Sequence, residues 1–502
     1  MAQDEFLVVG NQWLRWLKNR KSPKMGKILF VHKIHGTEHP SLSIEYLSAY
    51  LKSQGHKTSL IVDFNDNCFK RRLDIRIRNE KPDLIGFSVL TPLYNWAISV
   101  STHLKEGNRV PIVFGNVHPT VIPEFVMAND CVDFVVRGEG EYALAGLINS
   151  IVNKDKDYAK IKNLCYKTEK GLVCNPLGDL ISDLDSLPYP DKKITLNEMP
   201  FNKDIYYCLT ERGCPYSCNF CHNEVMRKLY YGHGSWVRRR SAQNVIEELR
   251  ITKKQGYRFV HFDDDCFVNS YVWVEDFVAL YKKYIKLPFQ INVRFRNITK
   301  KIASLLADAG CLSVKVGIQT TSDRLLEEIC NRVPDENVFE AARELKKRKI
   351  IIKVDTMIHL PTQRKEDIIE DILFYNKLRP DFIGLFNLIY FPGSKITDFA
   401  RLNGFIIPED EPRIYKEGLK ANYITDTALI DFMEFVSHLP IWLVNVCIKK
   451  RLWKIANGIL RRIQVFIKLP YYIKSKKRLL LTWLHIKMII RLKLHLFKIC
   501  KR

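Results

Sequence analysis

The sequence predicts two α/β units in series, each built on a parallel sheet, followed by a basic helical tail. Short apolar stretches alternate with helical stretches twice along the chain, and a segment with two prolines, DSLPYPD, separates the two series. Residues 441–502 hold seventeen Lys and Arg but no Asp or Glu. A chain of 502 residues is also long for a single hydrophobic core, so we expect several domains.

The first series spans residues 25–150 and predicts a doubly wound parallel sheet, after an N-terminal extension of residues 1–24. Its short apolar stretches are typical of buried strands, with a helix expected over 41–54 between the first two. The predicted strands are 27–32, 58–63, 83–91, 111–116 and 132–136. Ligands of such sheets bind beyond the carboxyl ends of the strands. The loops at those ends are His32–Pro40, Ser88–Pro92, Gly115–Pro119 and Gly138–Glu141.

The second series spans residues 201–400 and predicts a partial or full βα barrel, after a linker expected over 151–200. The predicted strands are 205–210, 258–263, 290–295, 313–318, 351–358 and 382–389, and the helices between them include 241–255, 300–309 and 336–348. The chemistry of such a barrel is expected at the carboxyl ends of its strands. Residues 401–502 are expected to form a C-terminal helical region.

Three cysteines follow the first strand of the second series, in the stretch ERGCPYSCNFCHN (211–223). Thiolates are soft ligands that suit zinc and iron–sulfur clusters. A structural zinc ion needs four protein ligands, which His222 or His233 could complete. An iron–sulfur cube held by only three thiolates keeps one iron open for another ligand.

The chain has thirteen cysteines, yet we expect a metal site rather than disulfides. The first twenty residues carry early acidic residues and scattered charge, so they lack the basic start and apolar core of a signal peptide. This predicts the reducing cytoplasm, where a tight cysteine cluster usually binds metal.

The spacing C-x3-C-x2-C, with Phe220 before the last cysteine, resembles the radical S-adenosylmethionine (SAM) enzymes. The resemblance implies that Cys214, Cys218 and Cys221 hold a [4Fe-4S] cluster whose open iron binds SAM, with Phe220 beside the cofactor. In that family the reduced cluster cleaves SAM to a 5′-deoxyadenosyl radical, which abstracts a hydrogen atom from the substrate. An external electron donor is therefore an expected partner.

The N-terminal half resembles the cobalamin-binding domain that precedes the barrel in one radical SAM subgroup. The stretches that carry this resemblance are SVLTP (88–92), GNVHPTVIPEFV (115–126) and VDFVVRGEGE (132–141). It implies cobalamin between the two domains. The implied cofactor-binding residues in the loops are Ser88, Thr91, Gly115, His118 and Glu139.

One departure concerns the cobalt ligand. The string D-x-H-x-x-G, whose histidine ligates cobalt in classical cobalamin domains, does not occur in this chain. His32 and His35 lie in the corresponding loop without that spacing. We therefore expect that no histidine of this chain coordinates cobalt.

Two further stretches supply candidates for SAM contact. The stretch VKVGIQTTSD (314–323) resembles the family strand that ends in Glu or Gln and contacts SAM, which implies Gln319. Arg294 and Arg296 alternate onto one face of a predicted strand, and one of them, for which we take Arg296, could bind the SAM carboxylate through two hydrogen bonds. A surface salt bridge would explain both arginines equally well.

The stretch HFDDDCFVNS (261–270) places acidic residues at another predicted strand end. Asp264, Asp265 and Cys266 are the catalytic candidates. A helix cap or a solvated turn would equally explain the acids, and a lone cysteine is more often buried packing.

The combined resemblance implies a cobalamin-dependent enzyme that transfers a methyl group to an unactivated carbon. Oxidative cyclisation or ring rearrangement is the alternative within this subgroup. Alternatives of other classes are a non-catalytic iron–sulfur or cobalamin sensor or carrier, and a tRNA-modifying enzyme, for which we find no RNA-binding module.

The tail predicts an amphipathic helix on an anionic membrane surface. Lys or Arg interrupts it every few residues, so no run reaches the ~18–20 apolar residues of a bilayer span. Its tryptophans, Trp442, Trp453 and Trp483, favour the membrane interface. We expect peripheral association with the inner face of the cytoplasmic membrane and a lipid or isoprenoid substrate. Nucleic acid is the less favoured partner, and a helical cap on the barrel is the structural alternative.

Overall fold

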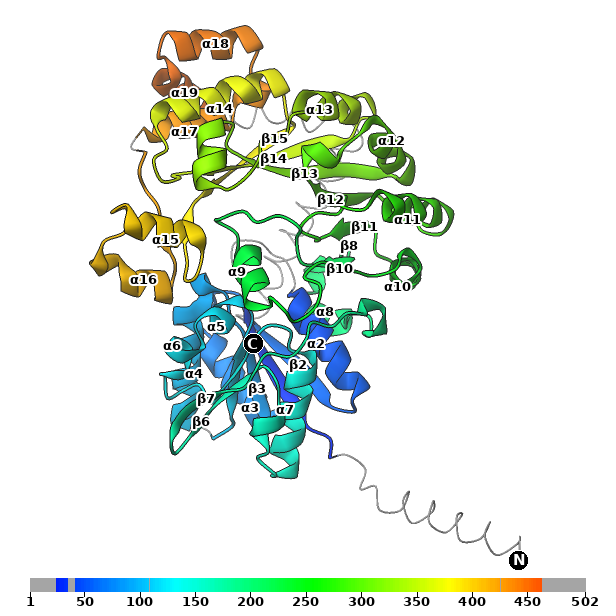
Figure 1. Ribbon diagram of the computed structural model, residues 1–502. Helices are drawn as coiled ribbons and strands as arrows, with labels where there is room; N and C mark the ends of the chain where they lie inside the picture. The colour runs from blue at the N-terminus through cyan, green and yellow to red at the C-terminus, as the bar shows by residue number, and fades with distance from the viewer. Residues whose placement is uncertain (1–23, 35–40, 108, 425, 463–502) are drawn as a thin grey trace, which may run out of the picture. The chain divides into compact units, whose positions relative to one another are not determined.

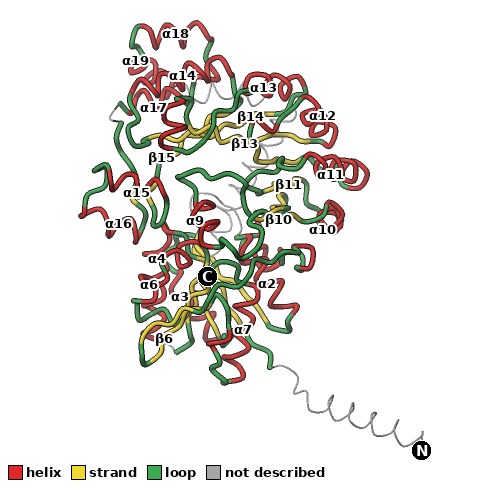
Figure 2. Tube along the Cα trace, in the orientation of Figure 1, coloured by secondary structure: helices red, strands yellow, loops and turns green. Residues whose placement is uncertain are grey.

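The computed structural model describes residues 24–34, 41–107, 109–424 and 426–462, which form two compact units (Figures 1 and 2). The N-terminal unit runs to Gly178, apart from the short segment Thr91–Asn95, and also includes Pro188–Glu198. The C-terminal unit holds Thr91–Asn95, Asp179–Leu187 and the chain from Met199 onward.

The N-terminal unit is the predicted doubly wound sheet. Its strand order is β2-β1-β3-β4-β5-β6-β7, and the first five strands in this order are parallel. These strands are β1 (Lys27–Lys33), β2 (Lys57–Asp63), β3 (Leu84–Ser88), β4 (Ile112–Gly115) and β5 (Phe134–Val136). All five lie within two residues of the predicted starts, because each is a short apolar run bounded by polar residues.

Helices cover both faces of this sheet. The helix α2 (Leu42–Ser53) packs against α7 (Glu141–Asn153). The helices α3 (Phe69–Glu80) and α4 (Tyr94–Gly107) are joined by His103 Nε2 and Asp74 Oδ1, 3.1 Å apart. Right-handed crossovers in this strand order place the two pairs on opposite faces. Two short helices, α5 (Val117–Val121) and α6 (Pro123–Met127), follow β4.

The expected linker over 151–200 is instead mostly part of this unit. The strands β6 (Leu164–Thr168) and β7 (Gly171–Cys174) form an antiparallel hairpin that extends the sheet. The helix α8 (Lys192–Glu198) returns to the unit, where Lys192 pairs with the fully buried Glu45 and Arg76 pairs with Glu198 at 2.8 Å.

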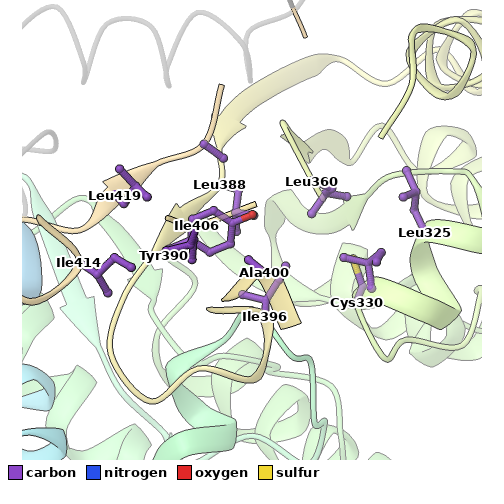
Figure 3. Packing of buried hydrophobic residues seen from close by; sticks show 12 residues of the cluster. Leu325, Cys330, Leu360, Leu388, Tyr390, Ile396, Ala400, Ile406, Ile414 and Leu419 are labelled. Atoms are coloured by element: carbon purple, nitrogen blue, oxygen red, sulfur yellow. The ribbon is translucent and has the colours of Figure 1, made fainter. Parts of the chain in front are cut away.

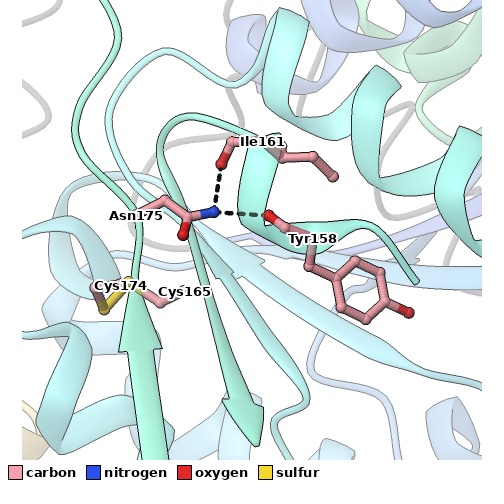
Figure 4. The surroundings of a disulfide bond; sticks show 5 residues. All are labelled: Tyr158, Ile161, Cys165, Cys174 and Asn175. Atoms are coloured by element: carbon pink, nitrogen blue, oxygen red, sulfur yellow. Dashed lines mark hydrogen bonds between the residues drawn. A yellow bond between two sulfur atoms is a disulfide. The ribbon is translucent and has the colours of Figure 1, made fainter.

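The hairpin also carries a disulfide, between Cys165 and Cys174 (Figure 4). The two residues are direct partners across the strands, with Cα atoms 4.1 Å apart, which is close enough for a bridge. Asn175 holds the end of the hairpin, donating hydrogen bonds to the carbonyl oxygens of Tyr158 (2.7 Å) and Ile161 (2.8 Å). Our expectation of metal binding rather than disulfides is therefore not met at these two cysteines.

The C-terminal unit contains the predicted barrel in its partial form. Six parallel strands lie in the order β15-β14-β13-β12-β11-β8, and within the described chain β8 and β15 do not pair with each other. The strands are β8 (Ile205–Cys208), β11 (Phe259–Phe262), β12 (Phe289–Val293), β13 (Cys311–Gln319), β14 (Ile351–Ile358) and β15 (Phe382–Asn387). The helices between them are α10 (Ala242–Lys254), α11 (Tyr271–Tyr284), α12 (Lys300–Ala309), α13 (Val338–Lys347) and α14 (Lys365–Leu378).

These helices lie along one side of the six-stranded sheet (Figures 1 and 2). Successive side chains of a strand point to opposite faces. In β13 and β14 the apolar Val314, Val316, Ile352 and Val354 are fully buried, whereas the residues between them are polar or small. The other face of the sheet is therefore the concave, polar inside of the partial barrel.

The chain after β15 packs against the loops that follow β13 and β14. It forms β16 (Ile389–Tyr390), α15 (Lys395–Leu402), α16 (Glu411–Lys416) and β17 (Leu419–Lys420). Their side chains share a hydrophobic cluster with Leu325, Cys330 and Leu360 (Figure 3). Phe220 packs against this cluster.

The described part of the tail forms the helical cap that we considered as an alternative. It consists of α18 (Ile441–Lys449) and α19 (Trp453–Arg462), which pack on α14 and on α17 (Thr427–Met433). Trp453 is buried, and the Lys365 Nζ lies 4.6 Å from its ring centroid. No helix in the described ranges is long and apolar enough to cross a membrane. The remainder of the tail, including Trp483, lies outside the described residues.

Candidate active site

The three cysteines occupy a loop at the carboxyl end of β8, where barrel chemistry was expected. The short strand β9 (Glu211–Arg212) leads into the loop, and α9 (His222–Leu229) begins immediately after Cys221. Gly213 opens the loop with a φ of 87°. A Cβ atom there would lie 2.2 Å from the Trp236 carbonyl oxygen, so this position requires glycine.

Backbone hydrogen bonds fix the loop in place. The Asn219 amide nitrogen donates to the Cys330 carbonyl oxygen at 3.1 Å, and the Ile396 amide nitrogen donates to the Asn219 carbonyl oxygen at 3.2 Å. The Asn331 side chain donates to the Ser217 carbonyl oxygen at 3.0 Å. Phe220, predicted beside the cofactor, is partly buried against the cluster of Figure 3 and anchors the loop there.

The three thiols are half-buried and close enough to influence one another. Burial raises the pKa of Cys214 to about 12, and the charges of Asp265 and Cys221 add to this rise. Burial likewise raises the pKa of Cys221 to about 11, with a contribution from Cys218. Such thiols stay protonated unless a metal replaces the proton, so metal binding here releases protons.

Three thiols on one loop are a donor set that fits a cluster with one open iron. Within the described residues, no three His, Cys, Asp or Glu side chains are arranged to hold one metal ion. His233, one of the two proposed zinc ligands, lies 3.5 Å from Asp179. In a cube each thiolate binds a different iron, so the three sulfurs need not converge on one point.

The acidic stretch after β11 divides into a structural and an exposed carboxylate. Asp264 is fully buried, and its Oδ1 accepts hydrogen bonds from the amide nitrogens of Thr210 (2.6 Å) and Glu211 (2.8 Å). Asp264 therefore positions the strand that leads into the cysteine loop. Asp265 is exposed and lies near the thiols, whereas Cys266 is buried, with its Sγ 3.5 Å from Asn297 Nδ2.

The two arginines are not in a strand as predicted, because β12 ends at Val293. Both pair with Asp335, Arg294 at 2.9 Å and Arg296 at 3.2 Å. The alternative that we weighed was a surface salt bridge, but the Arg294–Asp335 pair is buried, with side chains 10% and 7% exposed. Gln319 ends β13 with a φ of 74°, beside a bulge in the pairing with β14. Its side chain is half-buried at the predicted strand end.

A cavity of about 670 Å³ adjoins the cysteine loop. Pro215 and Tyr216 of the loop line it, together with Glu211, Arg239 and Trp273. The Arg239 Nε donates to the Glu211 carboxylate at 2.7 Å, and its guanidinium carbon lies 4.4 Å from the Trp273 ring centroid. Burial raises the pKa of Glu211 to about 7. The sequence analysis did not single out this group, because its members come from separate parts of the chain.

In the N-terminal unit the predicted cobalamin loops meet at the carboxyl edge of the sheet. Asn116 Nδ2 donates to Ser88 Oγ at 2.9 Å, which joins the loops after β3 and β4. Thr120 Oγ1 donates to the Asn116 carbonyl oxygen and accepts from the Gly138 amide nitrogen at 2.8 Å, which adds the loop after β5. Gly115 ends β4 within this edge. Small residues at this edge suit the approach of a large flat ring.

The other predicted residues of this unit lie in different settings. His118 is buried in α5, where burial lowers its pKa to about 4, and Glu139 is partly exposed after β5. Thr91 begins a 3-10 turn (Thr91–Leu93) that belongs to the C-terminal unit. His32 lies in β1 rather than in a loop, and burial lowers its pKa to about 4. His35 lies outside the described residues, so the absence of a cobalt-binding histidine stays a prediction.

Comparison with known families decides between the zinc-site and radical SAM interpretations of the cysteine loop. Residues 30–148 match the B12 binding domain, and residues 209–375 match the radical SAM superfamily. This chain is a cobalamin-binding radical SAM enzyme. Its cofactors are those predicted: cobalamin, a [4Fe-4S] cluster and SAM.

Two similar proteins each match at least three quarters of this chain. An uncharacterized methyltransferase of Pyrococcus horikoshii, PH0819, is 27% identical over 389 residues, covering 75% of this chain and 82% of the relative. The anaerobic magnesium-protoporphyrin IX monomethyl ester cyclase of Rubrivivax gelatinosus is 25% identical over 424 residues, covering 78% and 75%.

Two solved structures share the fold of this radical SAM enzyme. The radical SAM methyltransferase TsrM of Kitasatospora setae, with cobalamin and a [4Fe-4S] cluster bound, has a TM-score of 0.65 at 19% identity, covering 76% of this chain and 75% of TsrM. The cobalamin-dependent radical SAM enzyme OxsB has a TM-score of 0.67 at 17% identity, covering 93% and 72%.

Proposed function

We propose that this radical SAM enzyme transfers a methyl group to an unactivated carbon of a lipid or isoprenoid-type substrate. The observation that carries the proposal is the joining of a cobalamin domain to a radical SAM domain, in a chain similar to methyltransferases. When bound, the cluster and SAM supply a radical that removes a hydrogen atom, and cobalamin supplies the methyl group. Cys214, Cys218 and Cys221 would hold the cluster, and the edge formed by Ser88, Gly115 and Gly138 would hold cobalamin.

The relatives also favour a second candidate, oxidative cyclisation. The anaerobic cyclases of Rubrivivax gelatinosus and Cereibacter sphaeroides are 25% and 21% identical to this chain over more than 420 residues each. A cyclase removes hydrogen from its substrate without adding carbon, so the mass of the product separates the two reactions.

The decisive experiment uses SAM that carries a deuterated methyl group. The enzyme is incubated without oxygen with this SAM, a strong reductant and a lipid extract, and products are analysed by mass spectrometry. We expect lipids that have gained a labelled methyl group, and none with the Cys218→Ala variant. Products that have lost hydrogen without gaining label would instead support the cyclase.

An exposed apolar row on the cap supports the lipid substrate. Ile441, Trp442 and Val446 of α18, and Ile455 and Ile459 of α19, are 42–66% exposed. Cations stand among them in the sequence, and residues 441–502 contain no acidic residue. Apolar side chains beside cations suit the interface of an anionic membrane. We therefore propose that the enzyme lies peripherally on the inner membrane face, where an anionic surface is available.

We predict that this row contributes to membrane binding. The triple variant Trp442→Ser, Ile455→Ser, Ile459→Ser should bind vesicles of phosphatidylglycerol at least tenfold more weakly than the natural enzyme in a sedimentation assay. Leu402→Ser is the matched control, because Leu402 is 87% exposed on α15, outside the cap. Binding should also weaken as salt is added and strengthen as the fraction of anionic lipid rises. Unchanged binding of the triple variant, or a preference for RNA, would contradict this prediction.

The cap restricts how the tail can be truncated. Cutting the chain at Pro440 would remove the buried Val444, Trp453 and Leu460 and thereby uncover the helices α14 and α17 on which the cap packs. Asn376 would also lose the Ile441 carbonyl oxygen, to which it donates at 3.1 Å. Single side-chain replacements on the exposed face avoid this damage.

A further inference from the structure

Charged side chains occupy the concave face of the six-stranded sheet. Lys315 of β13 and Lys353 and Asp355 of β14 alternate with the fully buried valines and isoleucine that face the helices. Lys315 Nζ lies 2.9 Å from Asp355 Oδ2. Lys353 Nζ donates to Gln290 Oε1 at 2.6 Å. The cysteine loop follows β8, at the carboxyl end of the parallel sheet to which these strands belong.

The group has one cation more than it has anions. Asp355 pairs with Lys315, and none of the ion pairs of the described residues includes Lys353. Burial, with a smaller contribution from the charge of Lys315, lowers the pKa of Lys353 to about 8. A cation removed from water is costly unless an anion accompanies it. The pair itself is accessible, since the side chains of Lys315 and Asp355 are 38% and 21% exposed.

Apolar surface lies beside these charges. Phe386, near the end of the edge strand β15, is 48% exposed, and Lys315 Nζ lies 5.6 Å from its ring centroid. A Cβ atom on Gly384 would lie 3.0 Å from the Phe386 ring and 3.1 Å from Asp355 Oδ1, so the glycine keeps this region open. The face therefore combines a surplus cation with an apolar wall, which suits an amphiphilic anion.

We propose that Lys315 and Lys353 bind the anionic headgroup of the substrate, a carboxylate or a phosphate, inside the partial barrel. This inference rests on the proposed function and narrows its substrate to anionic amphiphiles. Lys315 lies in the middle of β13, four residues before Gln319, which ends the strand beyond a bulge. The methylated carbon, near the strand ends, is therefore several bonds away from the headgroup.

Binding of defined probes to the enzyme with its cofactors tests this inference. Calorimetry compares farnesyl diphosphate and palmitate with neutral farnesol. We expect at least one of the two anionic probes, the diphosphate or the carboxylate, to bind at least tenfold more tightly than farnesol. The Lys315→Met and Lys353→Met variants should each lose at least tenfold in that affinity, and Lys353→Arg should retain most of it.

The matched control is Lys282→Met. Lys282 is half-exposed on α11, 3.6 Å from Asp308, and removing it changes the net charge equally. It should bind the probes as the natural enzyme does. The inference would be overturned if farnesol bound as tightly as the anionic probes, or if neither anionic probe bound. It would also be overturned if both Met variants kept the natural affinity.

Activity separates this inference from the proposed function. The lipid extract is divided by anion exchange into neutral and anionic fractions before the labelled-methyl assay. Labelled products should arise from the anionic fraction, and the Lys315→Met and Lys353→Met variants should lose them, whereas Lys282→Met should keep them. Products from the neutral fraction alone would overturn the headgroup site but retain the methyltransferase. Tight probe binding without any labelled product would retain the site but contradict methyl transfer.

Discussion

Replacing any one of Cys214, Cys218 and Cys221 by alanine should abolish the formation of 5′-deoxyadenosine. Each thiolate holds a different iron, and the fourth iron must stay open for SAM, so a lost thiolate has no substitute. The natural enzyme, reconstituted without oxygen, should contain about four irons per chain by the stoichiometry of a cube. It should also show a reduced-cluster EPR signal that SAM perturbs. The variants should bind substantially less iron and give no SAM-dependent change.

Two other thiols near the loop provide the controls for this experiment. Cys266 and Cys330 are both buried, and the charge of Cys266 contributes to the raised pKa of Cys214. Burial raises the pKa of Cys330 to about 12, which keeps it a neutral packing group. The Cys266→Ala and Cys330→Ala variants should retain the iron content and SAM cleavage. Loss of the cluster in either of them would show that the ligand set differs from the motif.

The strands and the cysteine loop could be predicted from sequence because their signals are local. An apolar run such as SVKVGI specifies a strand, and the cysteine spacing lies within eight residues. The hairpin β6–β7 was missed because its strands are short and partly polar, with Cys165 and Cys174 as its most apolar pair of partners. Such strands form because they extend an existing sheet rather than through their own pattern.

Contacts between distant parts of the chain explain the remaining differences. Arg294 and Arg296 continue the alternation of β12, but Asp335, some forty residues later, holds both of them beyond the strand end. The concave charges were visible as lysines in otherwise apolar strands, yet only the strand order shows that Lys353 reaches Gln290 two strands away. Sequence periodicity predicts faces of elements, whereas the pairing of those faces requires the fold.

The role of Asp264 can be tested with two variants. A structural role predicts that only the alanine variant is impaired, whereas a catalytic role predicts that alanine and asparagine variants both lose activity. Both of its oxygens accept hydrogen bonds, from two backbone amides and from Thr210 Oγ1 at 2.9 Å. Alanine leaves two buried amides without an acceptor, at about 1–3 kcal/mol each. Asparagine keeps one carbonyl oxygen for the amides, and Thr210 can turn its hydroxyl to accept from the new amide.

We therefore expect Asp264→Ala to lower the unfolding temperature by about 5–10 °C and to reduce cluster content. Asp264→Asn should remain folded and cleave SAM within about tenfold of the natural rate. If the carboxylate of Asp264 were needed for chemistry, both variants would instead lose SAM cleavage to the same extent. Asp265→Asn is the control, because Asp265 is exposed and its replacement should leave stability unchanged.

The pH dependence of stability gives a second, independent test of Asp264. Burial raises its pKa to about 6, above that of an aspartate in the unfolded chain, about 3.9. Between pH 4 and 6 the folded enzyme therefore binds a proton that the unfolded chain has released, and the free energy of unfolding falls as the pH rises through this window. Asparagine does not titrate, so the difference in unfolding free energy between natural enzyme and Asp264→Asn should change across this window and level off above it.

Other buried carboxyls do not disturb this comparison. Burial also raises the pKa of Glu211 and Asp371, but both proteins contain these residues, so their contributions to the difference cancel. A difference that stays constant from pH 4 to 7 would show that Asp264 is ionised throughout, held so by its three donors.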